Sequence, residues 1–159
     1  MDKIILDATC GSRTIWFDKH NPRVLYVDKR SESLTRVWSG SERTCEVSPD
    51  VVADFTALPF EDNSFWHVVF DPPHLLHIGE TAWLKKKYGK LPDDWRPLIR
   101  DGFKECMRVL KPNGTLIFKW CEIDIPTREI IKAIGVEPLY GHRSGKKSQT
   151  HWLAFIKEE

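Results

Sequence analysis

Cysteine is scarce in this sequence, and its spacing argues against two kinds of site. The four cysteines stand at positions 10, 45, 106 and 121, and no two of them are close together. No cluster of histidines at metal-ligand spacing accompanies them, which argues against both a zinc site and a disulfide framework. We therefore expect no bound metal and a reduced, cytoplasmic protein.

Long apolar runs and an excess of one charge are also missing. No apolar stretch approaches the length of a membrane span, and the first one, residues 4–6, is too short for a signal peptide. The 24 basic and 23 acidic side chains leave a formal net charge of +1, so any affinity for nucleic acid must come from local patches. The 159 residues, 41% of them hydrophobic, are expected to form one domain, residues 1–159, around a single core.

Four short apolar runs each end in an aspartate, a pattern typical of buried parallel strands. They cover residues 4–7, 24–28, 50–54 and 66–71, and two prolines stop the last run. Amphipathic helices are predicted over residues 93–110 and 127–135, and further strands over 115–120, 136–140 and 152–156. Strands that alternate with helices predict an α/β fold, with helices on both faces of a mostly parallel sheet that has an antiparallel end.

The aspartates that end these runs are candidate binding residues. Ligands of open parallel sheets bind at the carboxyl ends of the strands, where Asp7, Asp28, Asp54 and Asp71 are all expected to lie. Asp28 follows Asp7 by 21 residues, the offset at which an acid in a nucleotide-binding fold accepts hydrogen bonds from ribose hydroxyls. For each acid alone, a solvated strand end or helix cap is the better explanation, but the set of four favours a common binding crevice.

The segment Asp71-Pro72-Pro73-His74, after a predicted buried strand, resembles the catalytic Asp/Asn-Pro-Pro-aromatic motif of S-adenosylmethionine-dependent methyltransferases that act on amino groups of adenine or cytosine. The resemblance covers nearly the whole chain. It implies a Rossmann-like class I fold whose seven-stranded sheet has the order 3-2-1-4-5-7-6 with the last strand antiparallel, and it implies S-adenosylmethionine as the cofactor. The residues implied to bind the cofactor are Asp7, Ala8, Thr9, Cys10, Gly11, Asp28, Lys29, Asp54, Phe55 and Asp71.

The same resemblance implies a role for each residue of the Asp-Pro-Pro-His segment. Asp71 and the backbone carbonyl of Pro72 would accept the two protons of the acceptor amine and turn its lone pair toward the methyl group. Pro72 and Pro73 stiffen the loop. His74 would flank the acceptor where relatives have a larger aromatic ring. Arg13 stands where many relatives have a second glycine, and it either binds the cofactor's carboxylate or points to solvent.

A narrower resemblance involves three features together. The chain is similar in them to small methyltransferase-like proteins from phages and mobile elements. The features are the run Cys10-Gly11-Ser12-Arg13, a shortened first helix and the Asp-Pro-Pro-His segment.

Two basic stretches are candidate contacts for a nucleic-acid substrate. Their cations are Lys85, Lys86, Lys87, Arg143, Lys146 and Lys147, and the first stretch also contains Trp83 and Tyr88. Cations suit phosphates and aromatic rings suit bases, although a lysine run is as often a solvated, mobile lid. Because the chain has no added target-recognition domain, RNA, DNA presented by a partner and a small amine all stay open as acceptors.

Two functions of other classes compete with methyl transfer. The departures at His74 and Arg13 fit a non-catalytic module that keeps the cofactor pocket and binds nucleic acid or regulates a partner. A nicotinamide-dependent oxidoreductase is less favoured, since Gly11 is the single glycine of the first turn and the glycine-rich dinucleotide fingerprint is missing. The oligomeric state is left open.

Overall fold

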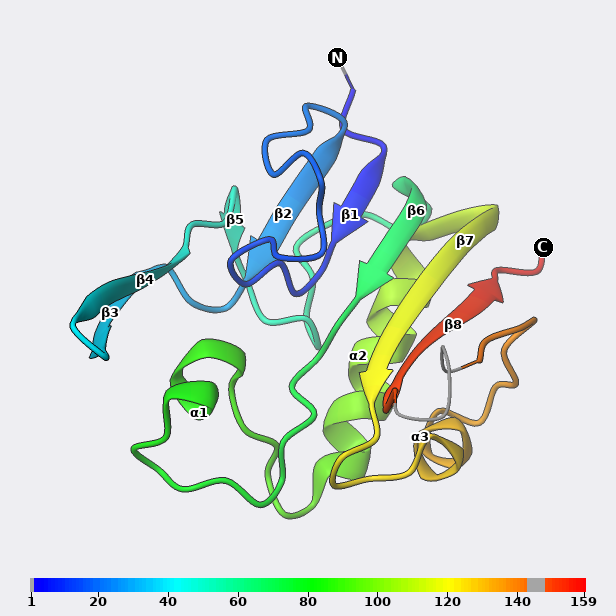
Figure 1. Cartoon of the computed structure of the whole chain (residues 1–159). Helices are drawn as coiled ribbons and strands as arrows, with labels where there is room; N and C mark the ends of the chain where they lie inside the picture. Colours follow the sequence, from blue (N-terminus) through cyan, green and yellow to red (C-terminus); the bar gives the residue numbers. More distant parts are fainter. Residues whose placement is uncertain (1, 143–147) are drawn as a thin grey trace.

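The computed structural model describes residues 2–142 and 148–159, which form a central sheet, packed helices and a separate hairpin (Figure 1). The strands are β1 Ile5–Asp7, β2 Val24–Asp28, β3 Glu32–Trp38, β4 Ser41–Val47, β5 Val51–Val52, β6 Phe65–Phe70, β7 Leu110–Cys121 and β8 Thr150–Ile156. The helices are α1 Trp83–Tyr88, α2 Trp95–Val109 and α3 Thr127–Ile134. None of the helices in the described ranges has the length and apolarity that spanning a membrane requires.

The central sheet has the strand order β5-β2-β1-β6-β7-β8. All neighbouring strands are parallel except β7 and β8, which run antiparallel. The prediction of a mostly parallel α/β sheet with an antiparallel end is confirmed. The carboxyl ends of β1, β2 and β6 therefore meet at one edge of the sheet, the edge that faces α1 in Figure 1.

The predicted seven-stranded order 3-2-1-4-5-7-6 is wrong at the edge of the sheet. Within the described residues, the segment 136–140 forms no strand and makes an isolated bridge between Tyr140 and Ala154. Pro138 has no N–H to donate to a ladder. Leu139 and Tyr140 are 61% and 70% exposed, so little apolar burial holds this segment against β8.

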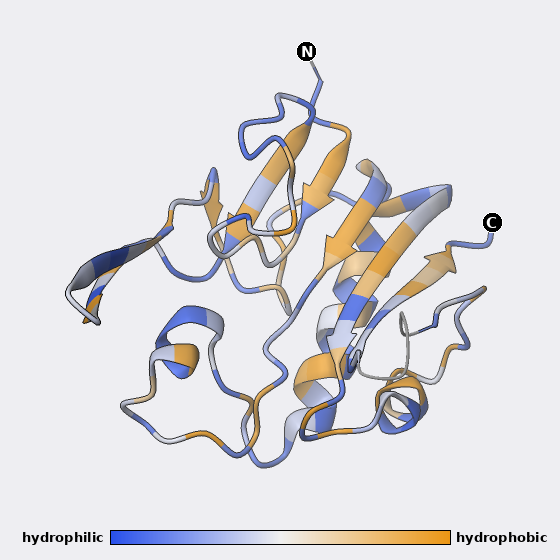
Figure 2. Ribbon diagram, in the orientation of Figure 1, coloured by the Kyte–Doolittle hydropathy of each residue, from blue (hydrophilic) through white to orange (hydrophobic). Residues whose placement is uncertain are grey.

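Helix α2 covers one face of the sheet and forms the main core with it. Figure 2 shows apolar residues concentrated on the central strands. The α2 residues Ile99 and Phe103 belong to one buried cluster with Leu6, Phe118 and Phe155 from three strands. Ile130 of α3 joins the same cluster. Burial of this face is the main stabilising contribution, because free energy follows the apolar area removed from water.

Gly102 allows α2 to approach the sheet closely. A Cβ at this position would lie 2.5 Å from Phe55 Cδ2 and 2.9 Å from Phe70 Cζ. We expect Gly102→Ala to lower the free energy of unfolding by about 1–3 kcal/mol through overpacking, despite the better helix propensity of alanine. Urea unfolding measures the effect. Gly79→Ala is the control because a Cβ there meets nothing within 4 Å; equal stability of both variants would contradict the prediction.

The opposite face of β1 and β2 is covered by a loop, where a short helix was expected. Between β1 and β2 the chain makes turns, and Gly11 and Arg13 have positive φ values of 48° and 55°, which interrupt a right-handed helix. Trp16 from this loop packs edge-on against Tyr26, with ring centres 5.6 Å apart. Within the described residues, α2 and α3 both pack into the core on one face of the sheet. The expectation of helices on both faces is therefore wrong.

Strands β3 and β4 form a hairpin that the sequence analysis missed. It projects away from the central sheet (Figure 1). Its two-residue turn, Ser39-Gly40, has positive φ at both positions, 49° and 76°, as tight hairpins of matching twist require. A Ser-Gly pair between two polar, β-branched stretches was the available signal. The hairpin has few apolar residues on a regular face, which hid it from a search for buried strands.

Candidate functional site

A cavity lies at the carboxyl ends of the parallel strands and encloses about 770 Å³, part of it open to solvent. Most of the residues singled out from the sequence line it, namely Ala8, Thr9, Cys10, Gly11, Asp28, Lys29, Phe55, Asp71, Pro72, Pro73 and His74. Other lining residues were not predicted, namely Thr14, Arg30, Gly89 and Lys119.

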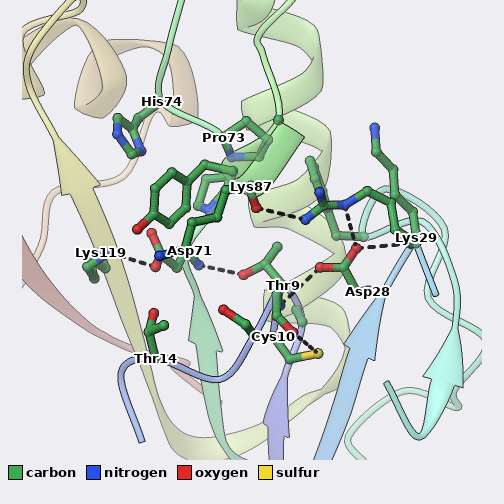
Figure 3. Close-up of a pocket in the computed structure, with 18 residues that line it drawn as sticks. Thr9, Cys10, Thr14, Asp28, Lys29, Asp71, Pro73, His74, Lys87 and Lys119 are labelled. Atoms are coloured by element: carbon green, nitrogen blue, oxygen red, sulfur yellow. Dashed lines mark hydrogen bonds and ion pairs between the residues drawn. The ribbon is translucent and has the colours of Figure 1, made fainter. Parts of the chain in front are cut away.

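Asp71 lies directly after β6, and contacts from the loop after β1 and from β7 fix it (Figure 3). Its backbone N–H donates to Thr9 Oγ1 at 2.7 Å, which ties the Asp-Pro-Pro segment to the loop after β1. Its Oδ2 accepts a hydrogen bond from Lys119 Nζ of β7 at 2.7 Å. The two prolines that follow have restricted φ angles. The Asp71 carboxylate therefore has a defined position at the cavity wall.

Burial sets the protonation of the two titratable groups in this segment. Burial raises the pKa of Asp71, and the positive charge of Lys119 acts in the opposite direction. Burial also lowers the pKa of His74, and the nearby Lys119 adds to this effect while Asp71 opposes it. The imidazole of His74 is therefore neutral at pH 7, which makes it an uncharged platform beside Asp71.

Asp28 is a buried acid at the end of β2, only 8% exposed. Its Oδ2 accepts the Gly11 N–H at 3.0 Å, and its Oδ1 accepts the backbone N–H and Nε of Arg30 at 3.0 and 3.3 Å. The Arg30 guanidinium also donates to the carbonyls of Lys86 and Lys87, at 2.7 and 3.3 Å. Arg30 thereby links the acid at the strand end to helix α1, whose last residues line the cavity.

The end of α1 packs on the Asp-Pro-Pro-His segment. Gly89 has φ of 80°, and a Cβ there would lie 3.1 Å from Pro73 Cγ, so this close approach favours glycine. The rings of Tyr88 and His74 have centres 6.2 Å apart at an interplanar angle of 43°. Both rings line the cavity, and they offer two flat surfaces beside Asp71.

Two of the four candidate acids do not line the cavity. Asp7 is 1% exposed, and its carboxylate accepts hydrogen bonds from Trp16 Nε1 at 2.6 Å and from the Thr9 N–H at 3.2 Å. Asp54 is exposed and accepts hydrogen bonds from the N–H and hydroxyl of Thr56. Asp7 thus organises the loop after β1, and Asp54 closes a local turn, while Asp28 and Asp71 reach the cavity.

Arg13 takes neither of the two orientations considered from the sequence. Its guanidinium donates to the carbonyls of Lys19 and Ser48, at 2.7 and 2.6 Å, and lies 3.8 Å from the centre of the Tyr26 ring. Arg13 therefore joins the first loop to the segment before β5. It does not line the cavity.

The first basic stretch belongs to α1 and its borders. Lys85 forms an ion pair with Glu80, and Lys87 lines the cavity with its ammonium 4.9 Å from the centre of the Tyr88 ring. Arg143, Lys146 and Lys147 of the second stretch lie outside the described residues.

Lys119 was not predicted as a site residue because residues 115–120 have the apolar pattern of one buried strand. The available signal was a lone lysine near the carboxyl end of an otherwise apolar run. Which neighbour this lysine meets depends on the order of the strands, which periodicity does not provide.

No protein-family model and no curated protein sequence matches this chain. Among solved structures, the PH0226 protein from Pyrococcus horikoshii is similar with a TM-score of 0.60 and 16% identity, over 97% of this chain and 81% of that one. A 1,6-didemethyltoxoflavin-N1-methyltransferase from Burkholderia thailandensis, solved with S-adenosylhomocysteine, has a TM-score of 0.55 and 15% identity over 99% and 72% of the two chains.

A third similar structure is a methyltransferase from Leishmania major that depends on S-adenosylmethionine. Its TM-score is 0.53 at 14% identity, and the match covers 95% of this chain and 63% of that one. At these identities the likeness concerns the fold. The chain has the α/β Rossmann-like fold of S-adenosylmethionine-dependent methyltransferases.

Proposed function

We propose that this protein is a methyltransferase that uses S-adenosylmethionine and modifies an amino group on a flat, ring-shaped acceptor. The observation that carries the proposal is the convergence of Asp28, the turn at Gly11 and Asp71 on one cavity. In this fold the carboxyl edge of the sheet is the ligand-binding edge.

The lining of the cavity suits the chemistry of the cofactor. Asp28 is the buried acid at the end of β2, and an acid at this point of a nucleotide-binding fold accepts hydrogen bonds from ribose hydroxyls. Gly11 has φ of 48°, and no atom lies within 4 Å of the place where its Cβ would be, so a ligand can approach the backbone there. Phe55 offers an apolar wall. When bound, S-adenosylmethionine supplies a methyl group whose bond to sulfur breaks, with the electron pair left on sulfur, as the acceptor nitrogen forms the new C–N bond.

The protein's part in the reaction is to orient the acceptor amine. A ring-conjugated amine is a poor nucleophile until its lone pair is turned out of the ring plane. Asp71 Oδ1 and the Pro72 carbonyl would accept the two amine protons and impose that orientation. As the nitrogen gains a positive charge, one proton passes to the Asp71 carboxylate and from there to solvent. The rings of His74 and Tyr88 would flank the flat acceptor.

A nucleobase in RNA or DNA is the acceptor that the surroundings of the cavity favour. Helix α1 brings Lys87 and Tyr88 to the cavity together, and this pairing of a cation with an aromatic ring suits a phosphate next to a base. A small heterocyclic amine is the second candidate, because the Burkholderia thailandensis enzyme of similar fold is named for such a substrate.

The proposal is tested by measuring methyl transfer from labelled S-adenosylmethionine to separate RNA, DNA and small-metabolite fractions. Mass spectrometry then identifies the labelled product. A labelled methylamino base supports the nucleobase acceptor, and a labelled metabolite supports the small amine. Tight cofactor binding without S-adenosylhomocysteine release in any fraction would overturn the enzyme assignment and favour a non-catalytic cofactor-binding module.

Asp28→Ala tests the cofactor site. We expect the dissociation constant for S-adenosylhomocysteine to rise about 10- to 100-fold, as for the loss of 1–3 kcal/mol from hydrogen bonds to a charged partner. Isothermal titration calorimetry measures it. Asp54→Ala is the matched control, because Asp54 also follows a sheet strand but does not line the cavity. Equal weakening by both variants would reject the cofactor site as described.

A further inference from the structure

Lys119 interrupts an otherwise apolar strand beside the Asp71 loop. Its neighbours Phe118 and Trp120 are fully buried in the core shared with α2. Side chains alternate along a strand, so Lys119 lies on the opposite face. Strand β7 runs parallel to β6, and Phe118 of β7 pairs with Phe70, the last residue of β6. Lys119 is therefore one strand away from Asp71, the residue that follows β6.

Two contacts hold the Lys119 ammonium group. Its Nζ donates to Asp71 Oδ2 at 2.7 Å, and it lies 5.8 Å from the ring centre of Trp152, its register partner on β8. The Lys119 and Asp71 side chains both line the cavity and are 21% and 23% exposed. An ion pair sheltered to this extent is screened less by salt than a surface pair, and it restricts the carboxylate to one orientation.

The charged groups around Asp71 act in opposite directions. Burial raises the pKa of Asp71, whereas Lys119 from β7 lowers it, as does His74 from the following loop when its ring is protonated. Asp7 from β1 is a like charge close enough to couple with Asp71. Without Lys119, burial and Asp7 would favour the protonated carboxyl, which donates a hydrogen bond where the acceptor amine needs an acceptor.

We propose that Lys119 is a positioning residue, whose ion pair with Asp71 Oδ2 holds the carboxylate so that Oδ1 faces the acceptor amine. The inference rests on the proposed methyltransferase function. Within residues 2–142 and 148–159, Oδ1 accepts no hydrogen bond. It is therefore the oxygen that can accept the amine proton. Lys119 acts through Asp71 and contributes no proton of its own.

The first test is a carboxyl titration of the free protein, which needs no substrate. Aspartate labelled with ¹³C is followed by NMR in the wild type, in Lys119→Met and in Lys119→Arg, with Asp71→Asn assigning the signal. We expect Asp71 in Lys119→Met to titrate about 1 to 3 pH units higher than in the wild type, and Lys119→Arg to restore most of the difference. Lys111→Met is the control, because this lysine is on the same strand and contacts Trp66 outside the cavity. An unchanged Asp71 titration in Lys119→Met overturns the inference.

The second test separates this inference from the proposed function. With an RNA or DNA fraction that the wild type methylates, turnover of Lys119→Met should fall about 10-fold or more at pH 7 and recover as the pH is raised. The dissociation constant for S-adenosylhomocysteine should change less than about twofold. A 10-fold weaker cofactor affinity would make Lys119 a cofactor ligand and overturn its positioning role. If the wild type has no turnover at all, the proposed function fails, while the NMR titration still decides whether Lys119 controls Asp71.

Discussion

Asp71→Ala is expected to lower methyl transfer by about 100- to 1,000-fold, the range measured when one preorganised hydrogen-bonding group is removed from an active site. The physical reason is that alanine cannot accept the amine proton or fix the lone pair of the nitrogen. Lys119 would also lose its partner at 2.7 Å. Cofactor affinity should change little, because Asp28 and the turn at Gly11 are unaltered. Single-turnover rates and calorimetry with S-adenosylhomocysteine measure the two effects.

Asp71→Asn controls for the empty space that alanine leaves. The amide oxygen can still accept one hydrogen bond, so this variant should retain more activity than the alanine variant while losing the charge that pairs with Lys119. Turnover of Asp71→Ala at the wild-type rate would remove Asp71 from the mechanism. A matching loss of cofactor affinity would instead place Asp71 in the cofactor site.

Asp7→Asn is expected to remove a loss of stability of up to about 4 kcal/mol that the wild type suffers between acidic and alkaline pH. Burial raises the pKa of Asp7 from its ordinary value of 3.8 to about 7, against hydrogen bonds from Trp16 and Thr9 that lower it. A shift of about three units corresponds to about 4 kcal/mol. Since the folded state binds the proton more tightly, the contribution of Asp7 to stability is complete below pH 3.8 and is lost as the pH rises through about 7. Asparagine stays neutral throughout this range.

Urea unfolding at pH 5 and pH 8 measures this effect. The wild type should lose more stability between the two values than Asp7→Asn, and the gain from asparagine should be largest at pH 8. Asp18→Asn is the control, because Asp18 is an exposed aspartate in the same loop. Identical pH dependence in the wild type and Asp7→Asn would show that Asp7 carries no burial penalty.

The pattern of apolar and polar residues along the chain already indicated the central sheet and the position of the Asp-Pro-Pro segment. Apolar runs that end in aspartate predicted β1, β2, β5 and β6 to within a few residues, because burial on both faces imposes a continuous apolar pattern on a parallel strand. The same local logic failed for residues 136–140, where exposed side chains and Pro138 prevent a strand. It also missed the β3–β4 hairpin, in which only Cys45 and Val47 of β4 are buried among exposed β4 residues.

Sequence by itself determined that acids would stand at the ends of successive strands and that Asp71 would be followed by a stiff loop. Only the tertiary structure decided which acids reach the cavity: Asp28 and Asp71 line it, whereas Asp7 is bound by Trp16 and Asp54 by Thr56. The pairing of Lys119 with Asp71 across 48 residues was decided in the same way. The physical reason is that burial patterns are local properties of the chain, while the direction and partners of a polar side chain depend on strand order, register and the loops packed above the sheet.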